Sequence, residues 1–395
     1  MDIARLIRRD TDLFLDDLAK LDEQLSEVVS GAKILIVGAA GSIGQAVTME
    51  LLNRHPKALH AVDISENNLV ELVRFVRSSV GYISGDFRTF AIDCASLEFD
   101  FFCSAEGPYD YVLNFSALKH VRSEKDPYTL MRMVEVNINN ALKILKVAKL
   151  HNAKNYFCIS TDKASNPVNM MGASKKIMEK LLISESLNQK ITMARFANVA
   201  FSDGSLLYGF NKRLENRQPI SAPNDIKRYF ISPKEAGQLC MLSSIFGNHN
   251  EIFFPKLDSQ YDMETFSNIA INFLELNGFE AVECESEEEA RLRAEDLINS
   301  KKWPVYFFKS DTTGEKYYEE FYTEDETLDL NRFNSIGIVK NAVEVDIDLL
   351  KKFQFDIKHM RTHGSWTKQN LVELFKMILP EFRHEEKGKY LDDRM

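Results

Sequence analysis

Residues 161–163 read Thr-Asp-Lys, and a second lysine, Lys175, follows in the next predicted helix. A hydroxyl, a carboxyl group and an amine in succession can relay, donate and accept protons, and each such positioned group typically contributes about 10²–10⁴ in rate. An isolated Asp-Lys pair would be read as a surface ion pair of little value to stability. This one directly follows the apolar run 155–160, a predicted strand, and ligands of open α/β sheets bind at strand ends. A role in chemistry is therefore favoured.

A glycine-rich segment near the N-terminus, residues 33–44, reads Lys-Ile-Leu-Ile-Val-Gly-Ala-Ala-Gly-Ser-Ile-Gly. This pattern predicts a strand, a turn and a helix: Gly38 permits the tight turn, Gly41 lets the backbone approach a pyrophosphate, and Gly44 lets the helix pack close to the sheet. Phosphates would lie on the helix N-terminus, where N–H groups and the helix dipole favour negative charge. The segment predicts a dinucleotide site made by Gly38, Gly41, Ser42, Ile43 and Gly44.

Two carboxylates end the next predicted strands. Asp63 stands where a carboxylate accepts hydrogen bonds from the ribose hydroxyls and repels a 2′-phosphate, which predicts NAD rather than NADP as the cofactor. Asp93 ends the third predicted strand and is placed to contact the adenine, although capping of a loop is nearly as good an interpretation.

Short apolar runs and longer amphipathic segments alternate from Lys33 onward. The predicted strands are Lys33–Val37, Leu59–Asp63, Thr89–Asp93, Tyr111–Phe115, Asn155–Ser160 and Ile191–Phe196. The predicted helices are Ile43–Arg54, Asn67–Ser79, Tyr128–Leu150 and Ala173–Glu185. Such alternation predicts an α/β fold with a Rossmann-type, doubly wound parallel sheet. After about Asn198 the alternation breaks down, which predicts a smaller C-terminal substrate-binding lobe with an acidic helix near 286–297.

We divide the chain into four parts. Residues 1–30 form an N-terminal helical extension, 31–200 the NAD-binding domain, 201–382 the substrate-binding lobe with elements that return to the core, and 383–395 a charged tail that we expect to be mobile. Apolar residues at near-helical spacing in the extension are expected to pack against the body or another subunit.

Composition restricts the class of protein. The chain has 395 residues, of which 45% are hydrophobic and 27% charged, and its net charge of −10 argues against binding to nucleic acid or an anionic membrane. The five cysteines form no CxxC pair, so buried free thiols in a reducing cytoplasm are expected. His359 and His363 have no further ligand pattern, and no metal is expected. Without a signal peptide or an apolar stretch of about 20 residues, we expect a cytoplasmic protein.

Several segments together resemble a known family. They are Phe115-Ser-Ala-Leu-Lys119, the run from Ser160 to Lys175, Ala194–Val199, Asp203-Gly-Ser205 and Lys227–Ile231. In order and spacing they resemble the CapD-like polysaccharide-biosynthesis branch of the extended short-chain dehydrogenases, and most of all its UDP-N-acetylglucosamine 4,6-dehydratases. The resemblance covers about residues 30–255, and a fainter one, at 314–320, is similar to a substrate-lobe signature of the same group.

The resemblance implies a reaction on UDP-N-acetylglucosamine or a close nucleotide sugar. NAD would accept hydride from carbon 4, water would leave across carbons 5 and 6, and the hydride would return to carbon 6 without net redox. Asp162 would be the acid at the 6-hydroxyl, Lys163 the base at carbon 5, and Thr161 a relay for the 4-hydroxyl proton. Lys163 can be a base only if its pKa falls towards neutrality, which we expect Lys175, the nicotinamide charge and desolvation to cause.

The usual Tyr-x-x-x-Lys pair of short-chain dehydrogenases is here Met171-x-x-x-Lys175. Methionine cannot exchange a proton, and the same replacement occurs in part of the dehydratase group, with a lean towards retention at carbon 5. Lys175 is expected to bond the nicotinamide ribose, with Met171 packed beside the sugar or the nicotinamide. Asn137, in the long predicted helix, has either a structural role or one in proton relay.

The resemblance also assigns binding residues. Ser116 and Ala117 would contact the cofactor, and four residues would contact the nucleotide sugar: Lys119, Asn198, Ser205 and Arg228. The guanidinium of Arg228 could bind phosphate through its planar fork. The alternatives are a surface arginine and, for Asn198 and Ser205, ordinary turn residues. The choice between UDP and GDP stays open.

Two other functions remain open. One is an NAD-dependent epimerase or reductase on a similar nucleotide sugar, which the methionine disfavours. The other is a non-catalytic NAD-binding regulator, which would not need Asp162, Lys163 and Lys175 together. By analogy with short-chain dehydrogenases, the helices predicted at Tyr128–Leu150 and Ala173–Glu185 would form a homodimer or a higher homo-oligomer.

Overall fold

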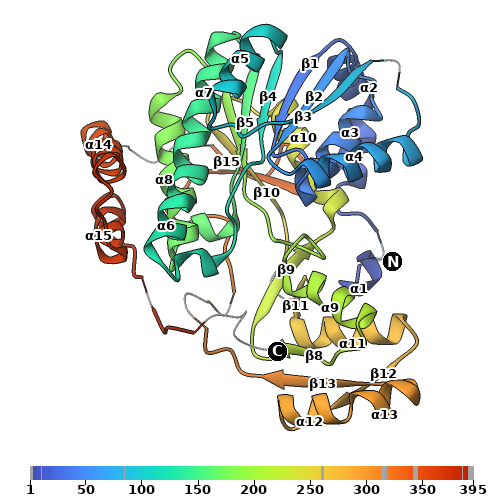
Figure 1. Cartoon of the computed structure of the whole chain (residues 1–395). Coiled ribbons are helices and arrows are strands. Elements are labelled where there is room, and N and C mark those ends of the chain that lie inside the picture. Colours follow the sequence, from blue (N-terminus) through green and yellow to red (C-terminus); the bar gives the residue numbers. More distant parts are fainter. Residues whose placement is uncertain are drawn as a thin grey trace.

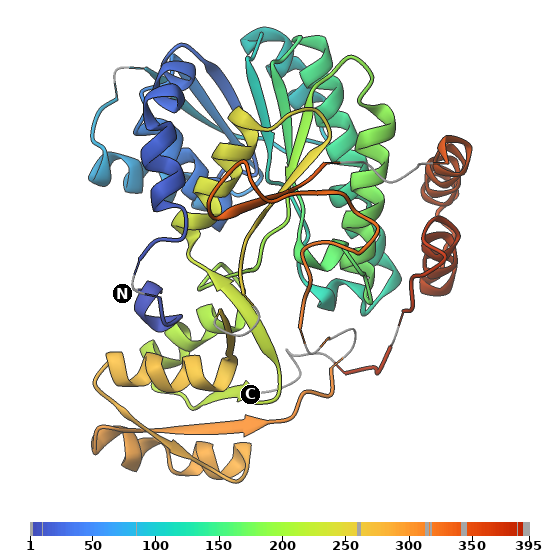
Figure 2. The same ribbon diagram turned by 180° about the vertical axis from the view of Figure 1, so that it is seen from behind.

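The structure is a computed structural model that describes residues 3–9, 11–83, 85–258, 262–312, 316, 318–340, 346–384 and 386–389. A large sheet with helices beside it forms the upper part of the molecule in Figure 1, and a smaller lobe lies below it. Figure 2 shows from behind that the chain crosses between these two parts more than once.

The main sheet has the strand order β14-β15-β10-β6-β5-β4-β1-β2-β3. From β10 to β3 all neighbours pair in parallel, and β15 and β14 join in antiparallel pairings at the opposite edge. The bounds are β1 Lys33–Val37, β2 Ala58–Asp63, β3 Asp86–Ala91, β4 Tyr111–Asn114, β5 Asn155–Ile159, β6 Ile191–Ala194, β10 Glu251–Pro255, β14 Leu328–Asp329 and β15 Ile336–Val339.

The strand order reverses between β1 and β4, because β1 continues to β2 and β3 on one side while β4 continues to β5 and β6 on the other. Right-handed crossovers in opposite directions place their helices on opposite faces, which makes the sheet doubly wound as predicted. Figure 1 shows helices on either side of the strands. They are α3 Ser42–Leu52, α4 Glu66–Ser79, α5 Leu97–Glu106, α6 Pro127–Val134, α7 Asn140–Leu150, α8 Met170–Glu185 and α10 Pro233–Phe246.

Several boundaries differ from the prediction for local reasons. Strand β3 ends at Ala91, so Asp93 lies beyond it. The predicted helix 128–150 is interrupted by a π-helical turn at Glu135–Asn139, which turns Asn137 into the interior. Helix α8 begins three residues before the predicted start because the Asn169 side chain accepts a hydrogen bond from the Gly172 N–H and caps it.

The lower lobe keeps an alternation that the sequence did not reveal. Strands β12, β13 and β8 form a parallel sheet, so the expected loss of regular alternation after Asn198 was wrong. Strand β12 is short and half-exposed, and β8 has four residues, of which one is serine and one proline. A second small sheet has the order β11-β9-β7. The lobe contains β7 Asn198–Val199, α9 Leu206–Glu215, β8 Ile220–Pro223, β9 Lys227–Ile231, β11 Met263–Thr265, α11 Phe266–Leu276, β12 Glu280–Glu283, α12 Glu287–Leu292, α13 Ala294–Asn299 and β13 Lys302–Phe308.

Helices α14 (Ile347–His363) and α15 (Lys368–Ile378) lie beside α6 and α8 (Figure 1). Leu371, Phe375 and Ile378 of α15 are buried, and the Trp366 indole N–H donates to the Pro127 carbonyl at 2.9 Å. This face was predicted to pair with the same helices of a second chain. Part of it is instead covered by helices of the same chain, and homo-oligomerisation stays a prediction.

The N-terminal extension packs against both parts of the body. Packing against the body was one of the two roles predicted for it, the other being packing against another subunit. Helix α2 (Leu15–Ser30) buries Leu25 and Val29 in the core of the main sheet. Helix α1 (Ile3–Leu6) contributes Leu6 to the separate apolar cluster of the lower lobe. All five cysteines are buried and unpaired. No helix among the described residues is long and apolar enough to cross a membrane, and the tail residues Glu385 and 390–395 lie outside the described part.

Asp17 of α2 is a specific tie between the extension and the sheet. Its buried carboxylate accepts the backbone N–H groups of Asn334 and Ser335 at 2.6 and 2.8 Å, just before β15. Asp17→Ala leaves both donors without that partner and should lower the free energy of unfolding by about 1–3 kcal/mol in urea denaturation. Asp22→Ala, on the same helix but 61% exposed in its pair with Arg54, should change it little. Equal losses in the two variants would contradict this role.

Candidate active site

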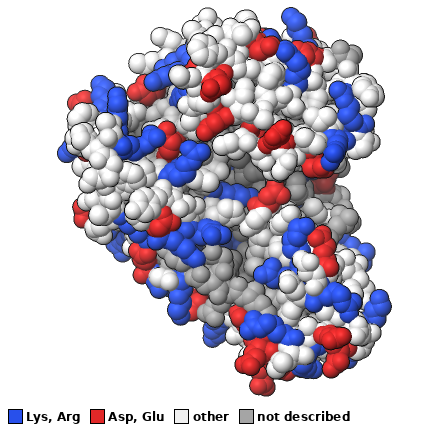
Figure 3. All heavy atoms as spheres, viewed as in Figure 1, with Lys and Arg blue, Asp and Glu red and all other residues white. Residues whose placement is uncertain are grey.

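One large cavity lies at the carboxyl ends of the strands, beside the reversal of strand order between β1 and β4. Its volume is about 590 Å³, within the range of about 300–1,000 Å³ that is typical of small-molecule sites. The glycine turn, the end of β5, the start of α8 and residues of the lower lobe line it. Figure 3 shows Lys and Arg side chains around the hollow between the upper and lower parts, although the net charge of the chain is −10.

The glycine turn forms one wall: Gly38, Gly41, Ser42, Ile43 and Gly44, the residues predicted to bind the cofactor, all line the cavity. Gly38 has φ +77°, and a Cβ there would lie 2.6 Å from the Ser116 nitrogen. A Cβ at Gly44 would lie 2.2 Å from the Gly38 carbonyl oxygen, whereas at Gly41 the nearest atom would be 3.7 Å away. Gly38 and Gly44 are therefore required by the turn itself, and Gly41 leaves its side open towards the cavity.

The other predicted cofactor residues differ in position. Ala117 lines the cavity, whereas Asp63, Asp93 and Ser116 are not among its lining residues. Asp63 accepts the N–H groups of Ala40 and Ser65, each at 2.9 Å, and so holds the turn. Asp93 accepts the Ala95 N–H at 2.9 Å, which is the loop-capping alternative. The Ser116 hydroxyl donates to the Asn114 side chain at 2.6 Å.

Thr161, Asp162 and Lys163 meet in the same cavity, at the end of β5. The Thr161 hydroxyl donates to Oδ1 of Asp162 at 2.8 Å, and Nζ of Lys163 lies 3.3 Å from the same oxygen. Helix α8 packs directly on this segment: a Cβ at Gly172 would lie 2.4 Å from the Lys163 carbonyl oxygen. The predicted triplet is thus a connected hydrogen-bonded group, and helix α8 packs against its backbone.

The expected fall in the pKa of Lys163 was wrong. Burial by itself lowers the pKa of this amine, but attraction from Asp162 and Glu319 more than offsets burial, and the pKa is raised above its ordinary value. The Glu319 carboxylate lies 3.5 Å from Nζ and was not singled out in the sequence. It belongs to the faint 314–320 resemblance, of which Gly314, Glu315 and Tyr317 lie outside the described residues.

Lys175 and Met171 also line the cavity and are buried. Nζ of Lys175 donates to the Ile159 carbonyl at 3.0 Å, and burial lowers the pKa of this amine. Asn137 has the structural role: its side chain accepts the Leu118 N–H at 2.9 Å and donates to the Leu118 carbonyl at 3.1 Å and to the Ser174 hydroxyl at 2.9 Å. It fixes the loop after β4 to α8.

Three of the four predicted substrate residues line the cavity: Lys119, Asn198 and Ser205. Ser205 also caps α9 by accepting the Tyr208 N–H at 3.1 Å. Arg228 is not among the lining residues; its guanidinium is 4% exposed and lies 4.0 Å from Glu319. An unpredicted contact joins the two parts of the molecule across the cavity, where the Ser42 hydroxyl donates to Asp203 at 2.9 Å.

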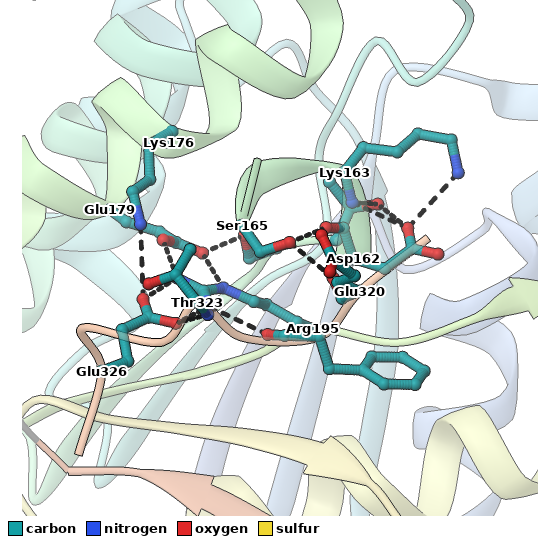
Figure 4. A network of polar contacts seen from close by, with 12 residues as sticks. Asp162, Lys163, Ser165, Lys176, Glu179, Arg195, Glu320, Thr323 and Glu326 are labelled. Carbon is teal, nitrogen blue, oxygen red and sulfur yellow. Dashed lines mark hydrogen bonds and ion pairs between the residues drawn. The ribbon is translucent and has the colours of Figure 1, made fainter. Parts of the chain in front are cut away.

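A buried ionic cluster lies behind the triplet (Figure 4). Arg195, which follows β6 and is fully buried, binds Glu179 of α8 at 2.7 and 2.9 Å and Glu326 at 2.8 Å through both carboxylate oxygens. Lys176 lies 3.3 Å from Glu326, and the Ser160 hydroxyl donates to Glu179 at 2.5 Å. The cluster joins β5, β6 and α8 to the segment 319–326. Arg195 belongs to the segment Ala194–Val199 that carries the family resemblance, but its partners are distant in sequence, so the sequence did not predict the cluster.

Comparison with protein-family models and with known proteins identifies the family of this chain. The model of the polysaccharide biosynthesis protein family matches residues 34–341. An uncharacterized membrane protein from Methanocaldococcus jannaschii is 27% identical over 80% of this chain and 88% of its own. A UDP-N-acetylglucosamine 4,6-dehydratase (inverting) from Campylobacter jejuni is 31% identical over 58% of this chain and 68% of its own. The probable polysaccharide biosynthesis protein EpsC from Bacillus subtilis is 26% identical over 85% of this chain, which spans about half of EpsC, 52%.

Solved structures share the fold. Pen from Bacillus thuringiensis superposes with a TM-score of 0.65 at 21% identity, over 89% of this chain and 98% of Pen. The dTDP-glucose 4,6-dehydratase DesIV from Streptomyces venezuelae, solved with NAD bound, has a TM-score of 0.55 at 15% identity, over 73% of this chain and 83% of its own. These identities support a common Rossmann-type architecture and, by themselves, nothing beyond it.

The ionic cluster predicts a specific loss of stability in acid. Burial alone would raise the pKa of Glu326, but Arg195 and Lys176 lower it from 4.5 to about 2. A carboxyl group whose pKa is lowered in the folded protein stabilises the fold at pH values above its ordinary pKa. This contribution, about 3 kcal/mol, is lost as pH falls towards 2. Glu326→Gln should therefore be less stable at pH 7 and show a shallower decline below pH 4.5 in urea denaturation across pH.

Glu215→Gln is the control, because Glu215 is 61% exposed in a surface pair with Lys212. Its stability should decline with acid as steeply as that of the unmodified protein. An equally steep decline in Glu326→Gln would show that the cluster does not hold Glu326 in its ionised form.

Proposed function

Because the chain belongs to the polysaccharide biosynthesis protein family, we propose that it is an NAD-dependent 4,6-dehydratase of a nucleotide sugar, with UDP-N-acetylglucosamine as the favoured substrate. The observation that carries the proposal is the connected group Thr161, Asp162 and Lys163 on the wall of the same cavity as the glycine turn. An acid, a hydroxyl relay and an amine at one strand end are what oxidation followed by elimination of water requires.

The residues present fit NAD. Helix α3 begins at the turn without a side-chain cap, so its first N–H groups can donate hydrogen bonds to a phosphate, and Gly41 presents only backbone there. Asp63 ends β2 next to the turn, where a carboxylate disfavours a 2′-phosphate. When bound, the nicotinamide would supply the acceptor and donor of hydride; Lys175 and Met171 are the residues we expect beside it.

The proton from the sugar 4-hydroxyl has a path within the triplet. The Thr161 oxygen can take that proton while its own passes along the 2.8 Å hydrogen bond to Asp162. A protonated Asp162 is then the acid that the departing 6-hydroxyl needs. The proton of the 4-hydroxyl therefore leaves in the water molecule, and no net proton is taken from solvent.

Lys163 is the amine beside this acid and remains our candidate base at carbon 5. Two other lysines line the cavity, but Lys175 is bonded to the Ile159 carbonyl and Lys119 lies 3.4 Å from the Ser202 hydroxyl. Met171 stands where an epimerase or reductase would need a tyrosine, which favours dehydration. If Lys163 both removes and returns the proton, the configuration at carbon 5 is retained.

The proposal predicts a product that proton NMR can identify. The purified protein, incubated with UDP-N-acetylglucosamine without added cofactor, should give a new 6-methyl doublet and lose the 6-hydroxymethyl signals. Lys163→Ala should lower turnover by about 10²–10⁴-fold and still bind NAD. Turnover retained in Lys163→Ala would contradict the assignment of the base.

Other outcomes decide between the alternatives. An unchanged spectrum after addition of NAD directs the test to the GDP-linked sugar. A product that keeps its 6-hydroxymethyl group and its mass would instead indicate epimerisation. No reaction with either sugar would favour a non-catalytic NAD-binding protein.

The glycine turn supplies a matched pair of variants. Gly41→Ala has room for its methyl group but directs it at the expected pyrophosphate, so NAD binding by calorimetry should weaken by at least tenfold while thermal stability is kept. Gly44→Ala would bring its Cβ to 2.2 Å from the Gly38 carbonyl, so it should lose stability even without NAD. Unweakened NAD binding in Gly41→Ala would contradict this site.

A further inference from the structure

We propose that Glu319 is a positioning residue for Lys163, which holds the amine at the end of β5 as an ammonium ion until the reaction neutralises Asp162. This inference rests on the proposed function, because it concerns the base of that reaction. Glu319 is not among the lining residues of the cavity, so it would act through Lys163 and not on the sugar.

The geometry encloses the amine between two carboxylates. Nζ of Lys163 lies 3.3 Å from Asp162 and 3.5 Å from Glu319, and both carboxylate side chains are 4% exposed. The Arg228 guanidinium lies 4.0 Å from the same Glu319 oxygen, and its side chain is equally buried. Two anions and two cations thus balance in a cluster whose side chains are buried, apart from Lys163, which is 19% exposed and faces the cavity.

The charges decide the state of the amine. If Lys163 alone lost its proton, the cluster would carry a net negative charge away from solvent, which is costly. Attraction from both carboxylates accordingly raises the pKa of Lys163, although burial lowers it and Arg228 lowers it further. In the resting site Lys163 is therefore a cation and cannot remove a proton from carbon 5.

Oxidation of the sugar changes this balance. When Asp162 receives the 4-hydroxyl proton through Thr161, the ammonium keeps Glu319 as its one remaining carboxylate neighbour in the cluster, and a transfer over 3.5 Å to Glu319 leaves the amine neutral. The neutral amine takes the carbon 5 proton, the C–H electrons form the double bond to carbon 6, and Asp162 protonates the leaving hydroxyl. The hydride taken from carbon 4 would return to carbon 6 from the reduced nicotinamide, and the ammonium then returns a proton to carbon 5 and regains one from Glu319. Every group thus ends as it began, and the sugar has lost one water molecule.

The position of Glu319 depends on contacts of its neighbours in the chain. The Arg195 guanidinium donates to the Phe321 carbonyl at 2.9 Å, and the Ser165 hydroxyl donates to the Glu320 carbonyl at 2.5 Å. The Phe321 ring lies against Tyr229 and Phe254, with ring centroids 5.4 and 6.0 Å apart. The segment is thus fixed at the two residues that follow Glu319, so Glu319 has a defined place beside the amine.

The test compares Glu319→Gln with Glu320→Gln. Glu320 is the adjacent carboxylate, but its side chain is directed to Asn166, at 2.8 Å, and it has no part in the proposed cluster. Carbon-13 NMR of lysine-labelled, NAD-loaded protein would follow the Lys163 side chain, which is identified by its absence in Lys163→Arg. In Glu319→Gln the amine should lose its proton at a lower pH than in the unmodified protein, and Glu320→Gln should titrate with the unmodified protein.

Activity gives a second readout. In Glu319→Gln the ammonium has no second carboxylate to which it can pass its proton, so the rising limb of kcat/KM against pH should move to higher pH, towards the pH at which the amine itself titrates. Glu319→Asp should restore part of the original profile. A purely structural residue would lower activity equally at every pH, and unshifted titration and profile in Glu319→Gln would overturn the proposal. Absence of dehydratase activity in the unmodified protein with a shifted lysine titration would instead reject the proposed function and keep the role of Glu319 in the charge of Lys163.

Discussion

The buried guanidinium of Arg195 is the contact on which the arrangement of the site depends. It joins α8, through Glu179, to the segment 319–326, through Glu326 and the Phe321 carbonyl, while its own backbone N–H is held by β10. Buried ion pairs are weak sources of stability, because desolvation offsets most of their attraction. Their value here is geometric: planar, bidentate bonds leave few alternative positions for three segments that are distant in sequence.

The same contact also places the charged side chains that surround the proton-transfer groups of the triplet. The triplet at the end of β5 provides proton-transfer groups, but their charges are set by side chains that the Arg195 cluster brings near. Glu319 reaches Lys163 because the segment that carries it is held on the core, and Ser160, one residue before Thr161, bonds Glu179 of the cluster. Helix α8 completes the support where Gly172 lies against the Lys163 carbonyl. Acid–base groups and their electrostatic surroundings thus form a single unit.

Local sequence reasoning succeeded where the signal is local. Six of the nine described strands of the main sheet were predicted within a few residues, because apolar runs and glycine turns are contiguous in the chain, whereas β10, β14 and β15 were not predicted. The glycine turn and the triplet do line one cavity. It failed for the lower-lobe sheet, in which β12 is short and half-exposed and β8 is a short strand with serine and proline, and for the long helix, where a π turn interrupts the helical period. It also gave the wrong direction for the pKa of Lys163. Burial lowers that pKa, but attraction from the adjacent Asp162 and from Glu319, more than 150 residues away along the chain, raises it.

The sequence by itself determined the doubly wound class, the dinucleotide turn and the identity of the proton-transfer groups, because these depend on residue type and on spacing within one strand–turn–helix unit. Only the tertiary structure decided which charges face one another. Arg228, Glu319 and Lys163 come from three separate segments, and the field at an amine depends on distance and burial. The protonation state of the candidate base, and with it the order of proton transfers, is therefore a property of the folded chain.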